Sequence, residues 1–384
     1  MERRTRLLLF TNVGLWAAAI VRVARGGGEW EPGKMPLGWD LAVFRVASRM
    51  WRSGAPLYDF AEQARVHAEL YGPGRDAYPF AYPPLLAIEA TPLALLPHAL
   101  AYALVTVTSL AVLVLLLRRL ELPARDALWV TASLPGFYAL LAGQLSFVSL
   151  AIFAATYLLL RASRPFLAGL ASSALAFKPQ LLVALPLLFL VDRRRTPGLA
   201  GLVAGVVAQL GVSFALAPDA TRAFPHALAT FADHASERFK GSLSFTWRGL
   251  FELLLPRAPA TALAIGALLA CAVVFARWVW TARADLDRAF SFTVIATLAC
   301  AWHCAPYDWV LLALPAMLLL PRANPRGLAP IMLVASLVGL WLVTPFVDAQ
   351  QRTFGVALHP AMILLIAFAA WLWRATPTAG HTSA

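Results

Sequence analysis

Long runs of apolar residues dominate this chain and restrict what it can fold into. Runs such as 98–117, 198–217 and 260–281 are comparable to the roughly 20 residues that a helix needs to cross a bilayer. Only helices or closed barrels can cross lipid, because every backbone polar group must find a partner within the protein. The runs are rich in Leu and Ala and do not alternate, which favours helices. We therefore predict an all-α fold, a polytopic transmembrane helical bundle.

The first apolar run, Leu7 to Ala24, follows arginines at positions 3, 4 and 6. A cleaved signal peptide is the alternative interpretation, but the run is long for one and further spans follow. An uncleaved first helix is therefore favoured. Basic residues before a first span indicate a cytoplasmic N-terminus, which places the polar segment 25–82 on the extracytoplasmic side.

The remaining hydrophobicity pattern predicts about 11 spans in a single membrane domain over residues 1–384. We expect a first extracytoplasmic loop at 25–82, a second polar loop at 218–243 and a disordered tail at 374–384. The expected runs after the first helix are 83–97, 98–117, 127–142, 144–160, 165–191, 198–217, 260–281, 289–304, 306–320, 328–347 and 358–373.

Prolines interrupt two of these runs. Four prolines fall within 83–97, and Lys178-Pro179 lies inside 165–191. Broken helices are tolerated in a membrane only where they are buried in protein or line a cavity. A hairpin bent at Lys178-Pro179 would also place the basic clusters Arg161/Arg164 and 193–195 on the same side, which one straight crossing could not do.

The formal net charge is +12, with 32 Lys and Arg against 20 Asp and Glu. In a soluble protein this balance would suggest a nucleic-acid partner. Here the basic residues cluster between apolar runs, which is typical of cytoplasmic loops and contacts with membrane lipids. We therefore expect no nucleic-acid partner. The cysteine count is three, and this odd number implies no disulfide framework.

A helix with two stripes is predicted early in the first loop. Apolar and small residues at 41, 44, 48 and 51 share one stripe, and Arg45, Arg49 and Arg52 share its neighbour. This pattern predicts an interfacial amphipathic helix with its apolar side toward lipid and its basic side toward phosphates. Asp40 begins the helix, either as a helix cap or as a general base facing a membrane cavity.

Lys178 is one of only three lysines and lies within an apolar run. A cation at membrane depth is costly and indicates function by default, although a lysine reaching the interface with its long side chain is the simpler alternative. His303 and Asp308 form another polar cluster between apolar runs, and we expect them to line the same cavity as Asp40 and Lys178. Cys300, His303 and Cys304 lack a fourth neighbouring ligand, so we predict no metal. The acidic pair at 285 and 287 is interpreted as a solvated loop.

Several motifs that are weak one by one combine into a specific pattern. They are Gly38-Trp39-Asp40-Leu41-Ala42-Val43-Phe44, Gly54, Pro56-Leu57-Tyr58, Phe80-Ala81-Tyr82-Pro83-Pro84-Leu85, Pro92, Leu96-Pro97, Gly143-Gln144, Ala168-Gly169-Leu170, Phe177-Lys178-Pro179, and His303 with Tyr307-Asp308. From about residue 36 to 320, this pattern resembles glycosyltransferase family 87, within the GT-C superfamily of polyprenyl-phosphate-sugar-dependent enzymes. One departure is Ser146, where the family pattern has Asn.

The resemblance implies transfer of mannose or another hexose from a polyprenyl-phosphate donor to a lipid or glycan acceptor, with inversion and without a cofactor. Such a reaction needs a base for the acceptor hydroxyl and cations for the departing phosphate. Asp40 suits the base, and the cations suited to the phosphate are Lys178, Arg45, Arg49 and Arg52. The other expected substrate-binding residues are Tyr82, Gln144, His303 and Asp308.

Two other classes of protein share parts of this pattern. A transporter or flippase for a lipid-linked or anionic substrate would also use broken helices and buried charges. A lipid-binding assembly subunit would need no base. The long outer segment and the absence of a visible inverted repeat favour the enzyme, with its active site on the extracytoplasmic side of the cell membrane.

Overall fold

The computed structural model describes residues 3–27, 29–31, 35–234, 242–322 and 329–376. Regular structure in the described residues is helical, as predicted, apart from a short antiparallel hairpin of β1 (Glu29–Glu31) and β2 (Met35–Pro36). The chain divides into two compact units. Unit 1 holds residues 1–132, 136–148 and 207–236, and unit 2 holds residues 133–135, 149–206 and 237–384.

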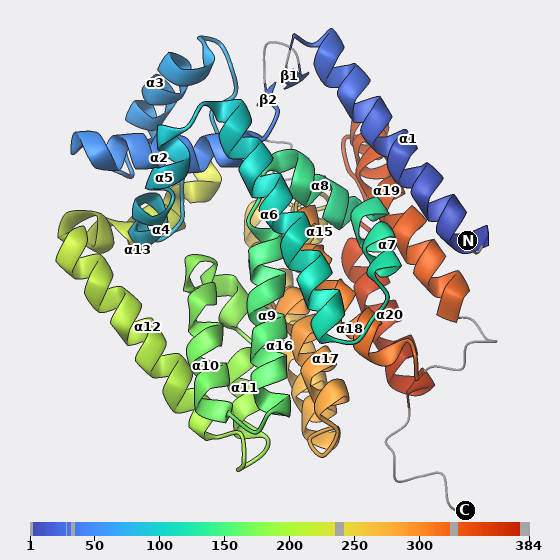
Figure 1. The fold of residues 1–384 in the computed structure, drawn as a ribbon. Coiled ribbons are helices and arrows are strands. Elements are labelled where there is room, and N and C mark those ends of the chain that lie inside the picture. The colour runs from blue at the N-terminus through green and yellow to red at the C-terminus, as the bar shows by residue number, and fades with distance from the viewer. Residues whose placement is uncertain (1–2, 28, 32–34, 235–241, 323–328, 377–384) are drawn as a thin grey trace, which may run out of the picture. The chain divides into compact units, whose positions relative to one another are not determined.

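Unit 1 contains two complete long helices, α1 and α6, which form over the predicted spans 7–24 and 98–117, and a group of shorter helices (Figure 1). Its elements are α1 (Arg3–Arg25), α2 (Trp39–Ser53), α3 (Phe60–Tyr71), α4 (Pro84–Glu89), α5 (Thr91–Leu95), α6 (His98–Arg119), η1 (Ala124–Asp126), α7 (Ala127–Ala132), most of α8 (Leu134–Ala142), the second half of α12 (Pro197–Leu216) and α13 (Pro218–His234).

A polar contact fastens α1 to α7. Asn12 is only 8% exposed, and its amide donates to the carbonyl oxygen of Leu128 at 2.7 Å while accepting from the Thr131 hydroxyl at 2.8 Å. Leu7 and Phe10 on the same helix are exposed. A membrane helix can expose apolar side chains to lipid, but its polar groups need partners within the protein. The pattern on α1 satisfies both conditions.

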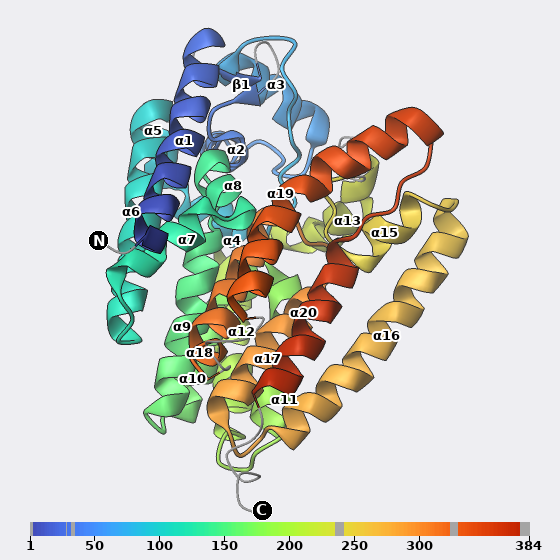
Figure 2. The same cartoon turned by 90° about the vertical axis from the view of Figure 1, so that its right-hand side faces the viewer.

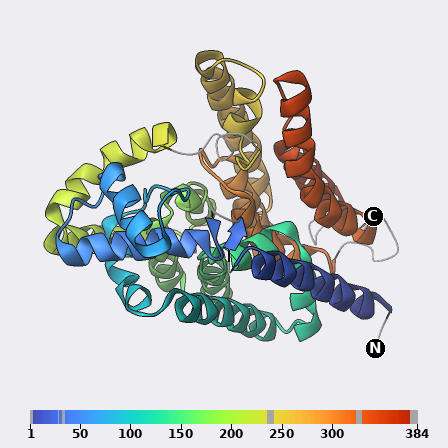
Figure 3. The same cartoon turned by 90° about the horizontal axis from the view of Figure 1, so that it is seen from above.

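Helix α2 forms over the expected residues, but its surroundings correct one expectation. Leu41, Phe44 and Ser48 are at most 1% exposed, because α3, α4 and α5 pack against this helix (Figure 3). The apolar stripe therefore faces protein and not lipid. The Ser48 hydroxyl donates to the carbonyl oxygen of Ala87 on α4 at 2.7 Å, so α2 is an internal helix of unit 1.

Unit 2 contains the remaining helices. Its elements are most of α9 (Ser146–Arg161), α10 (Pro165–Ser173), η2 (Ala174–Phe177), η3 (Pro179–Leu182), α11 (Leu185–Leu190), the first half of α12, α15 (Trp247–Glu252), α16 (Arg257–Thr281), α17 (Leu286–Ala299), η4 (Pro306–Leu312), α18 (Ala313–Leu319), α19 (Ala329–Phe354) and α20 (Ala361–Ala375). Helix α17 contacts α16, α18 and α20, whose ribbons are labelled in Figure 2, and its residues are almost all buried.

The run 165–191 is broken into four short helices and doubles back. On its first arm, α10 packs so tightly against α12 that a Cβ atom at Gly201 would overlap Phe166, and one at Gly205 would overlap Ser173. The contacts advance in the same direction along both helices, so α10 and α12 run parallel. The chain between them must return to its starting level, which agrees with the hairpin expected at Lys178-Pro179.

Four helices are long and apolar enough to cross a membrane in the described part of the chain, namely Arg6–Arg25, His98–Arg119, Pro197–Leu216 and Arg257–Thr281. Other expected spans are shorter or broken. The run 83–97 forms the six-residue α4 and the five-residue α5, and 127–142 forms α7 and α8. The number of about 11 spans therefore stays a prediction.

Two polar segments differ from their expected form. Residues 218–234 of the expected second loop are helix α13, which contacts α4, and Phe224 packs on Tyr58 with ring centroids 5.9 Å apart. Pro218 suits the first turn of a helix, and Asp219 suits its positive end. At the C-terminus, α20 includes Arg374. The rest of the expected loop at 235–241 and of the tail at 377–384 lies outside the described residues.

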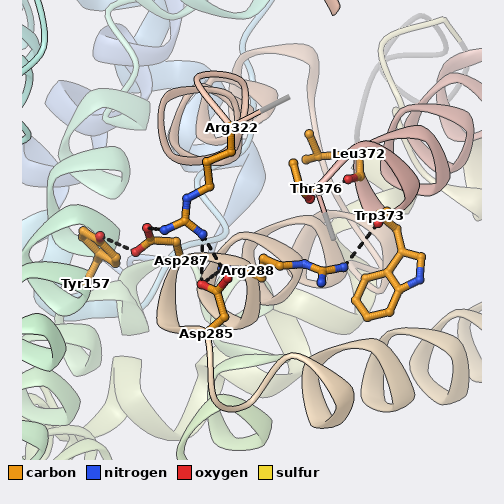
Figure 4. A network of polar contacts seen from close by, with 8 residues as sticks. All are labelled: Tyr157, Asp285, Asp287, Arg288, Arg322, Leu372, Trp373 and Thr376. Carbon is orange, nitrogen blue, oxygen red and sulfur yellow. Dashed lines mark hydrogen bonds and ion pairs between the residues drawn. The ribbon is translucent and has the colours of Figure 1, made fainter. Parts of the chain in front are cut away.

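The acidic pair at 285 and 287 belongs to a polar network and not to a solvated loop (Figure 4). Arg322 pairs with both carboxylates, and the Tyr157 hydroxyl donates to Asp287 at 2.6 Å. Arg288 extends the network to the carbonyl oxygen of Trp373 on α20 at 3.2 Å. These contacts join α9, α17 and α20 and leave the pair in a structural role.

The tight packing of α10 on α12 predicts opposite effects for two alanine substitutions in one helix. Gly201→Ala should lower the free energy of unfolding by about 1–3 kcal/mol, because the methyl group meets backbone. Gly211→Ala meets no atom within 4 Å in the described part of the chain, so better helix propensity should raise it by up to about 1 kcal/mol. Thermal unfolding in detergent measures both, and equal melting temperatures would contradict the packing.

Candidate functional site

The start of α2 packs against the corner between α8 and α9 in unit 1. Gly38 and Gly143 both have positive φ angles, 73° and 65°. A Cβ atom at Gly143 would lie 3.0 Å from Leu41 and 3.5 Å from the Cα atom of Gly38. Glycine is required at both positions, because only glycine combines this backbone conformation with so close an approach. Asp40 lies in the first turn of α2, at this contact.

Tyr82 and Gln144 meet near the same contact. The Gln144 amide is fully buried and donates to the Tyr82 hydroxyl at 3.4 Å. The Tyr82 ring packs edge-on against Phe44, with centroids 5.3 Å apart. Phe44 lies four residues after Asp40 and so on the same face of α2. The structure thus groups Asp40, Tyr82 and Gln144 in one part of unit 1, which we call the Asp40 cluster.

Two residues that the sequence interpretation missed hold Tyr82 in place. The Gln63 amide fixes Phe80, two residues before Tyr82. It accepts from the Phe80 N–H at 2.7 Å and donates to the Leu57 carbonyl oxygen at 2.8 Å. The Tyr58 hydroxyl donates to the carbonyl oxygen of Tyr82 at 2.6 Å, and burial raises the pKa of Tyr58 above its ordinary value. Tyr58 belongs to the family-like motif Pro56-Leu57-Tyr58, but the neighbouring residues do not indicate that it binds Tyr82.

The three predicted arginines of α2 separate into two groups. Arg49 and Arg52 are exposed, whereas Arg45 is 8% exposed and binds protein acceptors. Its guanidinium donates to the carbonyl oxygens of Leu93 at 3.3 Å and Leu96 at 2.6 Å. The Leu93 carbonyl would accept from residue 97 in a continuing helix, but residue 97 is proline and has no N–H. Arg45 therefore takes the place of a missing backbone donor.

A second cluster lies in unit 2 around Lys178, which we call the Lys178 cluster. The Lys178 ammonium and the Asp308 carboxylate are 2% and 3% exposed and lie 2.6 Å apart. Lys178 also lies over the Tyr307 ring, 4.9 Å from its centroid. The other Asp308 oxygen accepts from the Ala305 N–H at 3.2 Å. A buried charge is tolerated only with such partners.

His303 joins this cluster from the connection between α17 and η4. The charges of Asp308, Lys178 and Arg248 all act on the imidazole, which places it in the same group of side chains. Of the predicted site residues, the structure thus brings together Lys178, His303 and Asp308.

Arg248 is a further member of the Lys178 cluster that the sequence interpretation missed. It lies 5.4 Å from the ring centroid of Trp302, the residue before His303, and donates to Glu252 at 2.7 Å. The Phe245 N–H donates to the Cys304 carbonyl oxygen at 2.9 Å, which fixes the start of α15 beside this connection. An arginine two residues after Thr246, the N-cap of a six-residue helix, gave no signal in the sequence.

No group of three or more His, Cys, Asp or Glu side chains suited to a metal ion occurs among the described residues. Cys304 is buried, and Cys300 is partly buried with its thiol toward the Leu268 carbonyl oxygen. Ser146, the departure from the family pattern, is fully buried at the start of α9. The polar groups of the two clusters are thus carboxylate, amide, hydroxyl, ammonium, guanidinium and imidazole, which suit acid–base chemistry and anion binding.

A comparison with protein families matches a region that contains the Lys178 cluster and part of the Asp40 cluster. The model of glycosyltransferase family 87 matches residues 80–315, which is more than half of the chain. The chain belongs to glycosyltransferase family 87. The matched region includes Tyr82, Gln144 and the whole Lys178 cluster, while Asp40 lies before it.

A curated relative agrees with this assignment over a short region. The chain is 39% identical over 82 residues to a polyprenol-phosphate-mannose-dependent alpha-(1-2)-phosphatidylinositol mannoside mannosyltransferase of Mycolicibacterium smegmatis. The match covers 21% of this chain and 17% of the relative. No solved structure matches the chain significantly.

Proposed function

We propose that this protein is a membrane glycosyltransferase that moves mannose or another hexose from a polyprenyl-phosphate donor to a lipid or glycan acceptor. The observation that carries the proposal is the buried Lys178–Asp308 pair, which lies within the region matched by the family. The name of the mycobacterial relative supports a polyprenyl-phosphate mannose donor and a glycolipid acceptor. The four long apolar helices support a membrane location for both substrates.

The chemistry at the donor centres on the departing phosphate. In the donor the phosphate joins sugar and lipid and has one negative charge, and a second charge develops as the bond to the sugar breaks. A fixed cation lowers the energy of that change most when it needs no reorganisation. Lys178 fits this role, because Asp308 already holds its ammonium. His303 supplies a hydrogen bond in the same cluster, and Arg49 and Arg52 attract anionic lipid at the surface.

The chemistry at the acceptor requires a base. A sugar or lipid hydroxyl has a very high pKa, so its attack on the anomeric carbon needs a carboxylate that takes the proton as the new bond forms. We assign this role to Asp40, with Tyr82 and Gln144 orienting the acceptor. The hydroxyl oxygen forms a bond to the anomeric carbon while the phosphate oxygen leaves, so a single displacement inverts the anomeric centre.

Substitutions at Lys178 and Asp308 should affect stability and donor binding differently. Lys178→Met leaves a buried carboxylate without its cation and should lower the free energy of unfolding by about 3–5 kcal/mol. Adding Asp308→Asn removes that charge, keeps an acceptor for Ala305, and should restore most of the stability. The restored double variant should still bind donor about 1.5–3 kcal/mol more weakly, the value of a hydrogen bond to a charged group.

Thermal unfolding and transfer from a panel of polyprenyl-phosphate sugars measure these effects. Lys178→Arg is the control, because it keeps the charge and should retain part of the donor binding. A stable double variant with unchanged donor affinity and turnover would refute the role of Lys178. Movement of a lipid-linked sugar across vesicles without transfer would instead favour a flippase.

Substitution of Asp40 should lower the turnover number without impairing folding. The N-cap of α2 is Gly38 and not Asp40, and Asn has nearly the size of Asp, so Asp40→Asn should leave expression, melting temperature and donor binding near those of the natural protein. Removal of the base should lower turnover by about 10²–10⁴. Asp59→Asn is a matched control, because Asp59 caps α3 through the N–H groups of Ala61 and Glu62. Near-normal turnover of Asp40→Asn would exclude it as the base.

The orientation of the active site predicts which residues react from outside the cell. With Cys271, Cys300 and Cys304 replaced, a cysteine at the exposed position Pro73 should react with a membrane-impermeant maleimide in intact cells. A cysteine at the exposed Arg193 should react only after lysis, because basic loops stay in the cytoplasm. The reverse pattern would overturn the extracytoplasmic assignment of the segment 25–82.

A further inference from the structure

A chain of hydrogen bonds in unit 1 connects Arg45 to the backbone just before Asp40. Arg45 donates to the Tyr71 hydroxyl at 2.8 Å, Tyr71 lies 3.2 Å from Nδ1 of His98, and Nε2 of His98 lies 2.6 Å from the carbonyl oxygen of Leu37. The rings of Tyr71 and His98 are also edge-on, with centroids 5.2 Å apart. The four residues come from α2, α3, α6 and the segment before α2.

The direction of these hydrogen bonds follows from the groups involved. A carbonyl oxygen can only accept, so Nε2 of His98 donates to Leu37. In a neutral imidazole the other nitrogen then accepts, and the Tyr71 hydroxyl donates to Nδ1. The Tyr71 oxygen is left to accept from Arg45. Each polar group in the chain therefore has a defined role, and the tautomer of His98 is fixed.

The bond from His98 determines the plane of one peptide group. The Leu37 carbonyl and the Gly38 N–H belong to the same peptide unit, and this N–H donates to the Leu141 carbonyl oxygen of α8 at 3.1 Å. The unit is therefore held at both ends, by His98 on one side and by α8 on the other. Gly38 is the N-cap of α2, and its own carbonyl accepts from the Ala42 N–H at 3.0 Å. Asp40 follows two residues later.

The space around this peptide unit is tight as well. A Cβ atom at Gly38 would lie 2.6 Å from the Tyr102 ring and 3.5 Å from Nε2 of His98. Tyr102 comes one helical turn after His98 on α6. The same face of α6 therefore contacts Gly38 through both side chains, and a shift of His98 would change the first turn of α2.

We propose that His98 is a positioning residue that sets the place of Asp40 through the Leu37–Gly38 peptide unit, with Tyr71 and Arg45 orienting its ring. The proposal rests on Asp40 acting as the base. It also changes the interpretation of Arg45, which belongs to the scaffold of α2 and not to the phosphate site. A displacement of about 1 Å at a reacting group can lower a rate about a hundredfold. We therefore expect a change at His98 to lower the turnover number and to leave donor binding unchanged.

Two substitutions at His98 separate positioning from a general structural role. His98→Gln can keep a donor at the Nε2 position for Leu37 and loses the acceptor for Tyr71. His98→Asn can keep an acceptor at the Nδ1 position for Tyr71 and loses the donor for Leu37. Each variant removes one hydrogen bond, so similar melting temperatures are expected, and each serves as the control for the other.

Steady-state transfer by the full-length protein in detergent gives the result. With polyprenyl-phosphate mannose as the donor, His98→Gln should keep kcat within a few-fold of the natural protein, and His98→Asn should lower kcat about tenfold to a hundredfold with an unchanged donor KM. Equal kcat values for the two variants, or the reverse order, would overturn the proposal. Asp40→Asn in the same assay tests the base itself. If it is inactive while the two His98 variants are equal, only the positioning role fails; if it is active, the assignment of the base fails.

Discussion

Lys178 and Asp308 place an ammonium and a carboxylate 2.6 Å apart in the interior of unit 2, where each is at most 3% exposed. Two such charges are costly to remove from water, and only close contact with each other and with further polar groups compensates that cost. The two residues are 130 positions apart, so the pair requires two irregular segments to meet. One is the turn of the hairpin between η2 and η3, and the other is the connection from α17 to η4. The breaks in these helices are therefore a condition of the site.

The Asp40 cluster in unit 1 is positioned mainly by contacts to the backbone, whereas the Lys178 cluster is built around an ion pair. Glycines at 38 and 143 allow the start of α2 and the corner before α9 to approach within contact distance. Prolines produce the other necessary feature, because Pro97 leaves the Leu93 carbonyl without a helical donor and Arg45 replaces it. The side chains that pack and orient α2 thus satisfy backbone groups that the broken helices expose. The same breaks that remove helical length from α4 and α5 create acceptors for Arg45.

Local chemistry explains which of these features could be predicted from the sequence. A proline after a lysine inside an apolar run predicts a break and a buried cation, and both occur at Lys178. A stripe of apolar residues on α2 is different, because the same stripe suits lipid or protein, and the structure shows that it faces α3, α4 and α5. The partners of Arg45 and Lys178 could not be predicted, since they depend on contacts across 48 and 130 positions. Arg248 carried no local signal, because arginines are frequent in this chain.

The pairing of Lys178 with Asp308 bears directly on how a charged donor could be used. Asp308 accepts a hydrogen bond from the ammonium at 2.6 Å and fixes its position. A phosphate bound as proposed would share this ammonium with Asp308. The carboxylate weakens the attraction for the singly charged donor but fixes the cation in place. Because the phosphate gains charge as it leaves, the interaction with a fixed cation grows along the reaction. This difference between the bound donor and the transition state is what accelerates a reaction.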